Sequence, residues 1–282
     1  MRLLARVSVL ILLVGAGTSL LALQRGGFQQ QQDNPYGVAR EAFSDNYNGA
    51  DQKSEYSWSR LRYTSVYSGY GGFGGYGRGN WSTDYPKADR TFLTALRRLT
   101  RIQARPVEQV VDLDSLDATG NPIINNFPWV YAVQVQAWTF TEPEAKLLRE
   151  YLLKGGFLMV DDFHGAADWE QFMRGMLMVF PDRPIEDLND KDEIFHVLYD
   201  LGERFQVPGE QYVSSGRTCE KCPNEAEWRG IRDDRGRVMV AICHNMHLGD
   251  AWEWADDPRY PEKFASMAFR IGINYVMYGM TH

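Results

Sequence analysis

Three titratable side chains follow one predicted buried strand. The run Phe157 to Val160 is continuously apolar, which is typical of a strand covered by helices on both faces. Asp161, Asp162 and His164 come directly after it, and ligands of open α/β sheets bind beyond the carboxyl ends of the strands. Asp162 and His164 are therefore candidates for an acid/base pair or for half of a metal site. A turn in which the carboxylates only bind backbone amides is the equal alternative.

A second polar cluster follows the predicted strand 238–243. Histidines lie at the ends of other predicted strands or in predicted loops as well, and this distribution favours one cleft that the histidines share. For each histidine the alternative is a structural role. The candidate catalytic residues are Asp84, Asp162, His164 and Asp250. The histidines in loops or at strand ends are His164, His196, His244 and His247. A hydrolase built from these residues requires Asp84, Asp162, His164 and His247 to converge on one pocket.

Six further polar or aromatic residues are candidates for ligand binding. They are Trp81, Lys87, Arg217, Asn245, Trp252 and Glu253. Lys87 belongs with Asp84 to the first strand-to-helix turn, and Arg217 is a candidate anion clamp or an ordinary exposed arginine. Trp252 suits stacking on a sugar ring, but its spacing also fits a core residue.

The three cysteines leave three arrangements open: a zinc site, a disulfide, or neither. Cys219 and Cys222 lie in a predicted loop, and Cys243 and His247 lie at a strand end. Together they supply the ligands of a tetrahedral zinc site, which requires the three sulfurs to lie about 3.5–4 Å apart. An exported protein meets oxidising conditions, so a Cys219–Cys222 disulfide that leaves Cys243 free is the alternative.

The chain pattern predicts alternating strands and helices. Thr141 and Glu144 form a capping-box pair before a helix that Gly155 and Gly156 end. Further helices are predicted over 89–102, 168–180 and 261–278, strands over 56–66, 107–113 and 129–135, and a hairpin over 228–231 and 238–243. This order predicts an α/β fold in which helices cover both faces of a mainly parallel sheet, with an antiparallel hairpin near the C-terminal end.

The composition and the N-terminus indicate an exported globular protein. The 282 residues are 44% hydrophobic and 24% charged, with a net charge of −7, which argues against nucleic acid as a partner. Residues 1–24 are predicted to be a signal peptide or a membrane anchor, which places the remainder in the periplasm or at the extracytoplasmic face of the inner membrane. Residues 25–54 are predicted to be a disordered linker, and residues 55–282 an α/β domain with a Gly/Tyr-rich insertion at 69–79.

Three runs of the sequence resemble one bacterial family of unknown function. They are WSTDYPKADRTFLTALRRLT (81–100), YLLKGGFLMVDDFHG (151–165) and GDAWEWADDPRYPEKFASMAFRIGINYVMYGMTH (249–282). The resemblance covers about residues 56–282. It implies an exported or membrane-associated protein whose partners are envelope proteins, among them von Willebrand A-domain proteins or AAA-type ATPases of aerotolerance-type operons.

A more distant similarity links the chain to the class I glutamine amidotransferase-like superfamily. It rests on a strand, a glutamate-rich helix and a glycine pair before an apolar strand, and it implies a flavodoxin-like sandwich. An amidotransferase carries a cysteine on the sharp turn after a strand, whereas residues 161–165 contain neither thiol nor serine. We therefore expect a ligand- or partner-binding domain without glutaminase activity. The alternative is a hydrolase that uses Asp162 and His164 with residues 244–253, with or without a metal.

Overall fold

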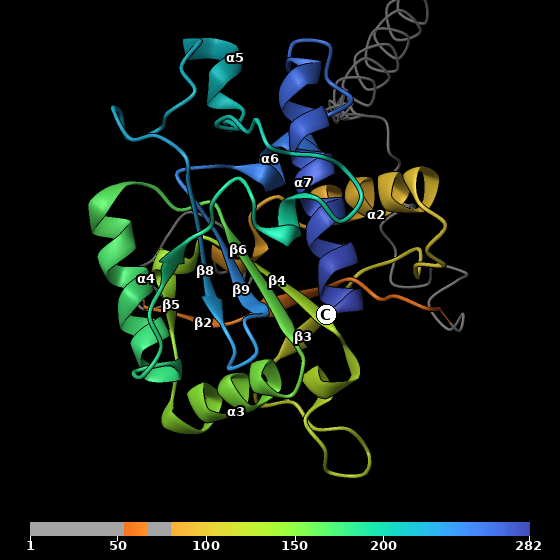
Figure 1. The fold of residues 1–282 in the computed structure, drawn as a ribbon, viewed down its shortest axis with the longest axis vertical. Helices are drawn as coiled ribbons and strands as arrows, with labels where there is room; N and C mark the ends of the chain where they lie inside the picture. Colours follow the sequence, from red (N-terminus) through yellow and green to blue (C-terminus); the bar gives the residue numbers. More distant parts are fainter. Residues whose placement is uncertain (1–53, 67–79) are drawn as a thin grey trace, which may run out of the picture. The chain divides into compact units, whose positions relative to one another are not determined.

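The computed structural model describes residues 54–66 and 80–282 (Figure 1). The predicted leader and the Gly/Tyr-rich insertion lie outside the described residues, as does the predicted linker except for Ser54. No helix in the described ranges is long and apolar enough to cross a membrane.

A seven-stranded sheet forms the centre of the described domain (Figure 1). Its order is β3-β1-β4-β6-β9-β8-β7, and its first five strands are parallel. β8 and β9 form the predicted antiparallel hairpin, and β7 pairs antiparallel with β8. These strands are β1 (Ser59–Arg62), β3 (Gln109–Asp112), β4 (Trp129–Val133), β6 (Phe157–Asp161), β7 (Glu186–Asp187), β8 (Glu227–Arg232) and β9 (Val238–His244). A separate two-stranded ladder joins β2 (Thr64–Ser65) to β5 (Trp138–Thr139).

The strand order is that of a doubly wound sheet. Counted along the chain, the five parallel strands lie in the order 2-1-3-4-5, which is the flavodoxin-like order. The predicted fold class is thus confirmed, including the antiparallel hairpin near the C-terminal end. The winding changes direction between β1 and β4, and ligands of such sheets bind beyond the carboxyl ends of the strands near that point.

Helices cover both faces because buried strand residues alternate between them. Trp129, Tyr131 and Val133 of β4 pack in one core cluster with α2, α6 and α7, whereas Val130 and Ala132 pack in the other with α3 and α4. The α-helices are α2 (Lys87–Leu99), α3 (Glu142–Leu153), α4 (Gly165–Val179), α5 (Gln211–Ser215), α6 (Leu248–Glu253) and α7 (Glu262–Thr281). The 3-10 helices are η2 (Asn80–Ser82), η3 (Ile123–Asn126), η4 (Val135–Ala137) and η5 (Glu193–Phe195).

The signals that predicted α3 and β6 act as expected. Thr141 accepts a hydrogen bond from the Glu144 amide and donates its own amide to the Glu144 carboxylate, so the capping box is complete. Gly155 has a φ of 114°, a conformation that glycine adopts without steric penalty. A Cβ at Gly156 would lie 2.4 Å from the ring of Tyr151. Because glycine has no Cβ, β6 can follow α3 this closely.

Candidate metal site

Three adjacent parallel strands end in a residue with a left-handed backbone. Gln134 follows β4 with a φ of 52°, Asp162 follows β6 with a φ of 57°, and Asn245 follows β9 with a φ of 61°. Non-glycine residues adopt this conformation rarely, and such strain concentrates at functional sites. At Asp162 the turn leads from a strand to a helix, as does the turn that presents the nucleophile of α/β-hydrolases.

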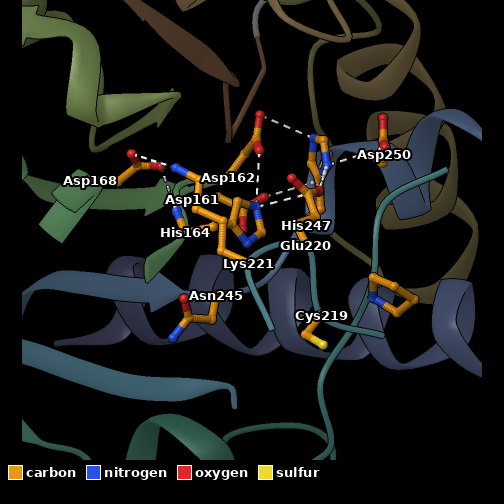
Figure 2. Close-up of polar contacts among 12 residues, drawn as sticks. Asp161, Asp162, His164, Asp168, Cys219, Glu220, Lys221, Asn245, His247 and Asp250 are labelled. Atoms are coloured by element: carbon orange, nitrogen blue, oxygen red, sulfur yellow. Dashed lines mark hydrogen bonds and ion pairs between the residues drawn. The ribbon is translucent and has the colours of Figure 1, made fainter. Parts of the chain in front are cut away.

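Four side chains converge beyond the carboxyl end of β6 (Figure 2). Asp162 Oδ1 lies 3.4 Å and Glu220 Oε1 lies 3.5 Å from His164 Nε2. His247 Nε2 is 3.1 Å from Asp162 Oδ2, and His247 Nδ1 is 3.3 Å from Glu220 Oε1. The ligand atoms of the four residues all lie within 4.8 Å of one another. We call Asp162, His164, Glu220 and His247 the four-ligand cluster.

Two more carboxylates lie on either side of His247. Its Nε2 atom is 3.3 Å from Asp84 Oδ2, and its Nδ1 atom is 3.2 Å from Asp250 Oδ2. Asp84 has a φ of 62°, and Asp250 accepts a hydrogen bond from the Glu210 amide at 2.6 Å. Within the described residues, His247 Nε2 and Asp84 Oδ2 are buried without a hydrogen-bond partner. Buried polar atoms are normally satisfied, so these two atoms indicate a missing partner.

The cluster carries an excess of negative charge. Four carboxyl groups, those of Asp84, Asp162, Glu220 and Asp250, face only two imidazoles, those of His164 and His247. The side chain of Asp162 is 1% exposed and that of His247 is 10% exposed, and buried charge is unfavourable unless it is compensated. A cation at this point would compensate it.

The electrostatics separate the carboxyls into two kinds. Burial disfavours ionisation of Asp162, but attraction to His247 and a hydrogen bond from His164 outweigh it and lower its pKa. The pKa of Glu220 is lowered for the same reasons. Burial raises the pKa of Asp250 to about 8, against the attraction of His247. Burial also opposes protonation of His247, yet the charges of Asp162, Asp250 and Asp84 raise its pKa well above the usual value.

Asp161 supports the site from behind rather than entering it. Its Oδ2 atom accepts hydrogen bonds from Tyr131 Oη at 3.0 Å, from the Leu248 amide at 2.8 Å and from the Gly249 amide at 3.0 Å. These bonds fix the start of α6 next to His247, which immediately precedes that helix. Burial raises the pKa of Asp161 to about 7. The two aspartates after the strand thus have different roles, Asp162 facing the site and Asp161 binding backbone amides.

The remaining ligand-binding candidates lie outside the four-ligand cluster. Trp81 contacts the ring of Tyr85 at a tilted angle, Lys87 pairs with Asp256, and Arg217 is exposed. Trp252 is fully buried among Trp58, Phe92 and Tyr131. The interpretation of Trp252 as a sugar-stacking residue is therefore wrong, because its ring offers no surface to a ligand.

Asn245 and Glu253 lie next to the site in supporting positions. Asn245 Oδ1 accepts a hydrogen bond from the Gly165 amide at 2.7 Å, and its Nδ2 donates to the Glu225 carbonyl at 2.8 Å. It therefore positions the turn that carries His164. Glu253 is half-buried, and burial first and the nearby charge of Asp84 next raise its pKa.

The four loop histidines do not share one cleft. His164 and His247 belong to the four-ligand cluster, whereas His244 binds Glu227 and the Gly165 carbonyl and lies tilted against the ring of Trp169. His196 is exposed and lies beside Asp200. The prediction of a common cleft is correct for two of the four.

The predicted Cys₃His zinc site does not form. Cys219 and Cys222 are joined as a disulfide, and Cys243 is a free, buried cysteine. Strand alternation turns Cys243 toward the α7 face of the sheet, where it packs in the core cluster of α2, α6 and α7. The disulfide lies instead in the loop before β8. The structure therefore has the alternative arrangement, and His247 belongs to a carboxylate–histidine cluster.

A large surface groove lies elsewhere. It has a volume of about 630 Å³ and is lined by residues of α3, of the C-terminal end of α4 and of the segment after it, among them Arg149, Met178 and Asp182. α4 is 15 residues long and begins at the site, so its two ends are about 22 Å apart at 1.5 Å per residue. We place the chemistry at the sheet edge because the titratable groups converge there.

Fold and site together define a doubly wound α/β domain with a carboxylate–histidine cluster at the carboxyl edge of its sheet. The chain belongs to the family described as domain of unknown function (DUF4159), whose model matches residues 70–280. This confirms the expected membership of a family of unknown function. Among curated proteins, none matches the chain.

Glu220 is the cluster member that sequence reasoning missed. It lies between Cys219 and Cys222, and the metal hypothesis assigned the ligands to these cysteines instead. The signal in the sequence was a carboxylate placed inside the short loop that the two cysteines close. Gly209 and Gly249 were also missed, although a Cβ at either would lie 2.6 Å or less from a carboxylate of the site.

Proposed function

We propose that this domain binds one divalent transition-metal ion through the four-ligand cluster and uses it in hydrolysis. The observation that carries the proposal is that each of the four residues offers one nitrogen or oxygen atom such that these atoms all lie within 4.8 Å of one another. Ligands about 2.0–2.1 Å from a zinc-like ion in a tetrahedron lie about 3.3–3.5 Å apart, so binding of the ion draws these atoms together by no more than about 1.5 Å. Mixed imidazole and carboxylate ligands suit zinc, manganese and iron.

The residues around the cluster suit hydrolysis. An ion of this kind supplies a Lewis acid for a water molecule or a substrate oxygen. Asp84 and Asp250 lie outside the four-ligand cluster and within 3.3 Å of His247, where they can accept or donate a proton. Asp161 and Asn245 keep the backbone under His247 and His164 in place.

We also propose that the domain acts outside the cytoplasm, in contact with envelope proteins. The Cys219–Cys222 disulfide supports this location, because disulfides persist mainly in oxidising compartments. The predicted leader and the predicted von Willebrand A-domain or ATPase partners belong to this proposal.

Metal analysis of the purified full chain tests the site. We expect close to one ion per chain and tight rebinding of Zn²⁺ or Mn²⁺ after chelation. Asp162→Asn and His247→Ala should each weaken metal binding by at least about 10–100-fold, which is the loss typical when only a partner of a ligand is changed. His196→Ala is the matched control, because this histidine lies outside the cluster. A wild-type chain that takes up neither ion would refute the proposal.

The same proteins test hydrolysis. The metal-loaded chain is assayed against ester, amide and phosphoester panels, with and without a thiol reductant because a disulfide borders the site. We expect hydrolytic activity that is lost on chelation and restored by added metal. Asp250→Asn should lower this activity while the chain retains the ion. Ion binding with no hydrolysis on any panel would leave a binding domain and reject the catalytic half.

A further inference from the structure

One of the four ligands comes from a loop rather than from the sheet edge. Glu220 lies between Cys219 and Cys222, which are joined as a disulfide. Its carboxylate is 3.5 Å from His164 Nε2 and 3.3 Å from His247 Nδ1, so it bridges the two imidazoles (Figure 2). Its side chain is 30% exposed, against 7% for His164 and 10% for His247. Glu220 therefore covers the site from the solvent side.

The next residue of the loop binds the same helix start that carries His164. Lys221 Nζ is 2.6 Å from Asp168 Oδ1, and Asp168 Oδ2 accepts a hydrogen bond from the His164 amide at 2.9 Å. The loop also packs over Gly165, where a Cβ would lie 3.1 Å from Asn224 Nδ2 and 3.3 Å from Lys221 Cδ. The tip of the disulfide loop thus binds the site at two adjacent positions.

Little regular structure holds this loop in place. The described residues 216–226 contain no helix or strand. The segment is fastened at its far end, where Gln206 Nε2 donates to the Asn224 carbonyl at 3.1 Å and Asn245 Nδ2 donates to the Glu225 carbonyl at 2.8 Å. The covalent bond between Cys219 and Cys222 is thus, beside the Lys221–Asp168 pair, the constraint on the two residues between them, and Cys222 is exposed to reductants.

We propose that the Cys219–Cys222 disulfide is a redox latch on the metal site. The inference rests on the proposed function. In the oxidised protein the latch holds Glu220 between His164 and His247 and closes the ligand set. Reduction frees Glu220 and leaves Asp162, His164 and His247 with an open position. Three protein ligands and an open position are the arrangement of catalytic zinc sites, whereas four protein ligands are typical of closed structural sites.

The reductant is a dithiol, protein-borne or small. One of its thiolates attacks a sulfur of the Cys219–Cys222 bond, which breaks as a mixed disulfide forms and the other cysteine leaves as a thiolate. The second thiolate of the reductant then displaces the remaining cysteine. Two electrons pass to the cysteines, the reductant becomes a disulfide, and the two cysteine thiolates take up the protons that the reductant's thiols released when they ionised.

Manganese binding to the full chain tests the latch. Mn²⁺ prefers carboxylate and imidazole to thiolate, so freed cysteines do not compete for it. We expect Cys219→Ser/Cys222→Ser, Glu220→Gln and the reduced, desalted wild type each to bind Mn²⁺ about 10–100-fold more weakly than the oxidised wild type. Adding Glu220→Gln to the serine pair should change little, because both remove the same contact.

Two controls separate the latch from the metal site itself. Hydrogen exchange of residues 217–225 in the metal-free protein should be faster in the serine pair, which tests the latch without any ion. Lys154 is exposed at the C-terminal end of α3, before β6. Lys154→Gln should therefore leave Mn²⁺ affinity unchanged. Equal Mn²⁺ binding by the oxidised wild type and the serine pair would overturn the latch alone. Absence of Mn²⁺ binding by every protein would overturn the proposed site and the latch with it.

Discussion

Glu253 is a residue whose ionisation opposes folding. Burial first, and the charge of Asp84 next, raise its pKa to about 7, whereas a free glutamate titrates near 4.5. Between these two values the folded protein retains a proton that the unfolded chain has lost. The free energy of unfolding therefore falls as the pH rises from about 4.5 to about 7, and this contribution is constant above that.

We expect Glu253→Gln to remove this pH dependence. The variant should gain stability relative to the wild type as the pH rises through that interval, by on the order of 1–3 kcal/mol in total. Urea unfolding from pH 4.5 to 8, with a chelator present, measures the difference. Glu170→Gln, at an exposed position on α4, controls for the loss of one negative charge. A difference that stays constant with pH would contradict the assignment.

Residue roles were predictable where chemistry and chain position coincide. Asp162, His164 and His247 follow predicted strands, and parallel strands bring their carboxyl ends to one edge. Trp252 was not predictable, because a tryptophan at helical spacing suits a surface stack and a core equally well. Glu220 was missed because its place in the cluster depends on a disulfide partner and on the path of an irregular loop, neither of which periodicity reveals.

The elements that build the site are short and irregular, unlike those that build the core. The amphipathic pattern predicted α2, α3, α4 and α7, and the hairpin residues predicted β8 and β9. α5 and α6 are only 5 and 6 residues long, too short for a periodic signal. The backbone around them is fixed by tertiary hydrogen bonds, such as that from the Glu210 amide to Asp250.

The segment before α5 requires a glycine against the site. A Cβ on Gly209 would lie 2.5 Å from His247 Nδ1 and 2.6 Å from Asp250 Oδ2. The neighbouring backbone has little freedom to withdraw, since Tyr260 donates to the Pro208 carbonyl at 2.6 Å and the His247 amide donates to the Val207 carbonyl at 3.0 Å. A methyl group here must therefore displace His247, Asp250 or both.

Gly209→Ala should weaken Mn²⁺ binding by about tenfold or more, in the range seen when supporting groups of metal sites are changed. Its loss of stability should fall in the 1–3 kcal/mol typical of overpacking. Isothermal titration and urea unfolding measure the two effects. Gly202→Ala is the matched control, because a Cβ there would meet only Asp200 Oδ1 at 3.7 Å. Unchanged ion affinity in Gly209→Ala would show that the segment does not bear on the site.

Across the whole domain, a buried ion pair connects the core to the site. Arg60 of β1 and Asp89 of α2 are both fully buried, and their side chains pair at 2.9 and 2.6 Å. Asp89 also accepts a hydrogen bond from Trp58 Nε1 at 2.6 Å. Arg60 Nη1 donates to the carbonyls of Trp81 and Thr83, directly before Asp84. The position of the Asp84 turn thus depends on a charge in the centre of the molecule.

A double-mutant cycle at this pair tests that dependence. Asp89→Asn leaves a buried guanidinium without its counter-ion, so we expect a loss of about 3–5 kcal/mol in the free energy of unfolding, as for other broken buried pairs. Arg60→Met/Asp89→Leu removes both charges, so its free energy of unfolding should fall by less than that of Asp89→Asn. A loss of about 1–3 kcal/mol should remain, because the Trp58 indole N–H is left without a partner. Urea unfolding of Asp89→Leu, Arg60→Met and the double variant gives the coupling energy. Additive losses would show that the two charges contribute separately, and that the turn before Asp84 is held by other contacts.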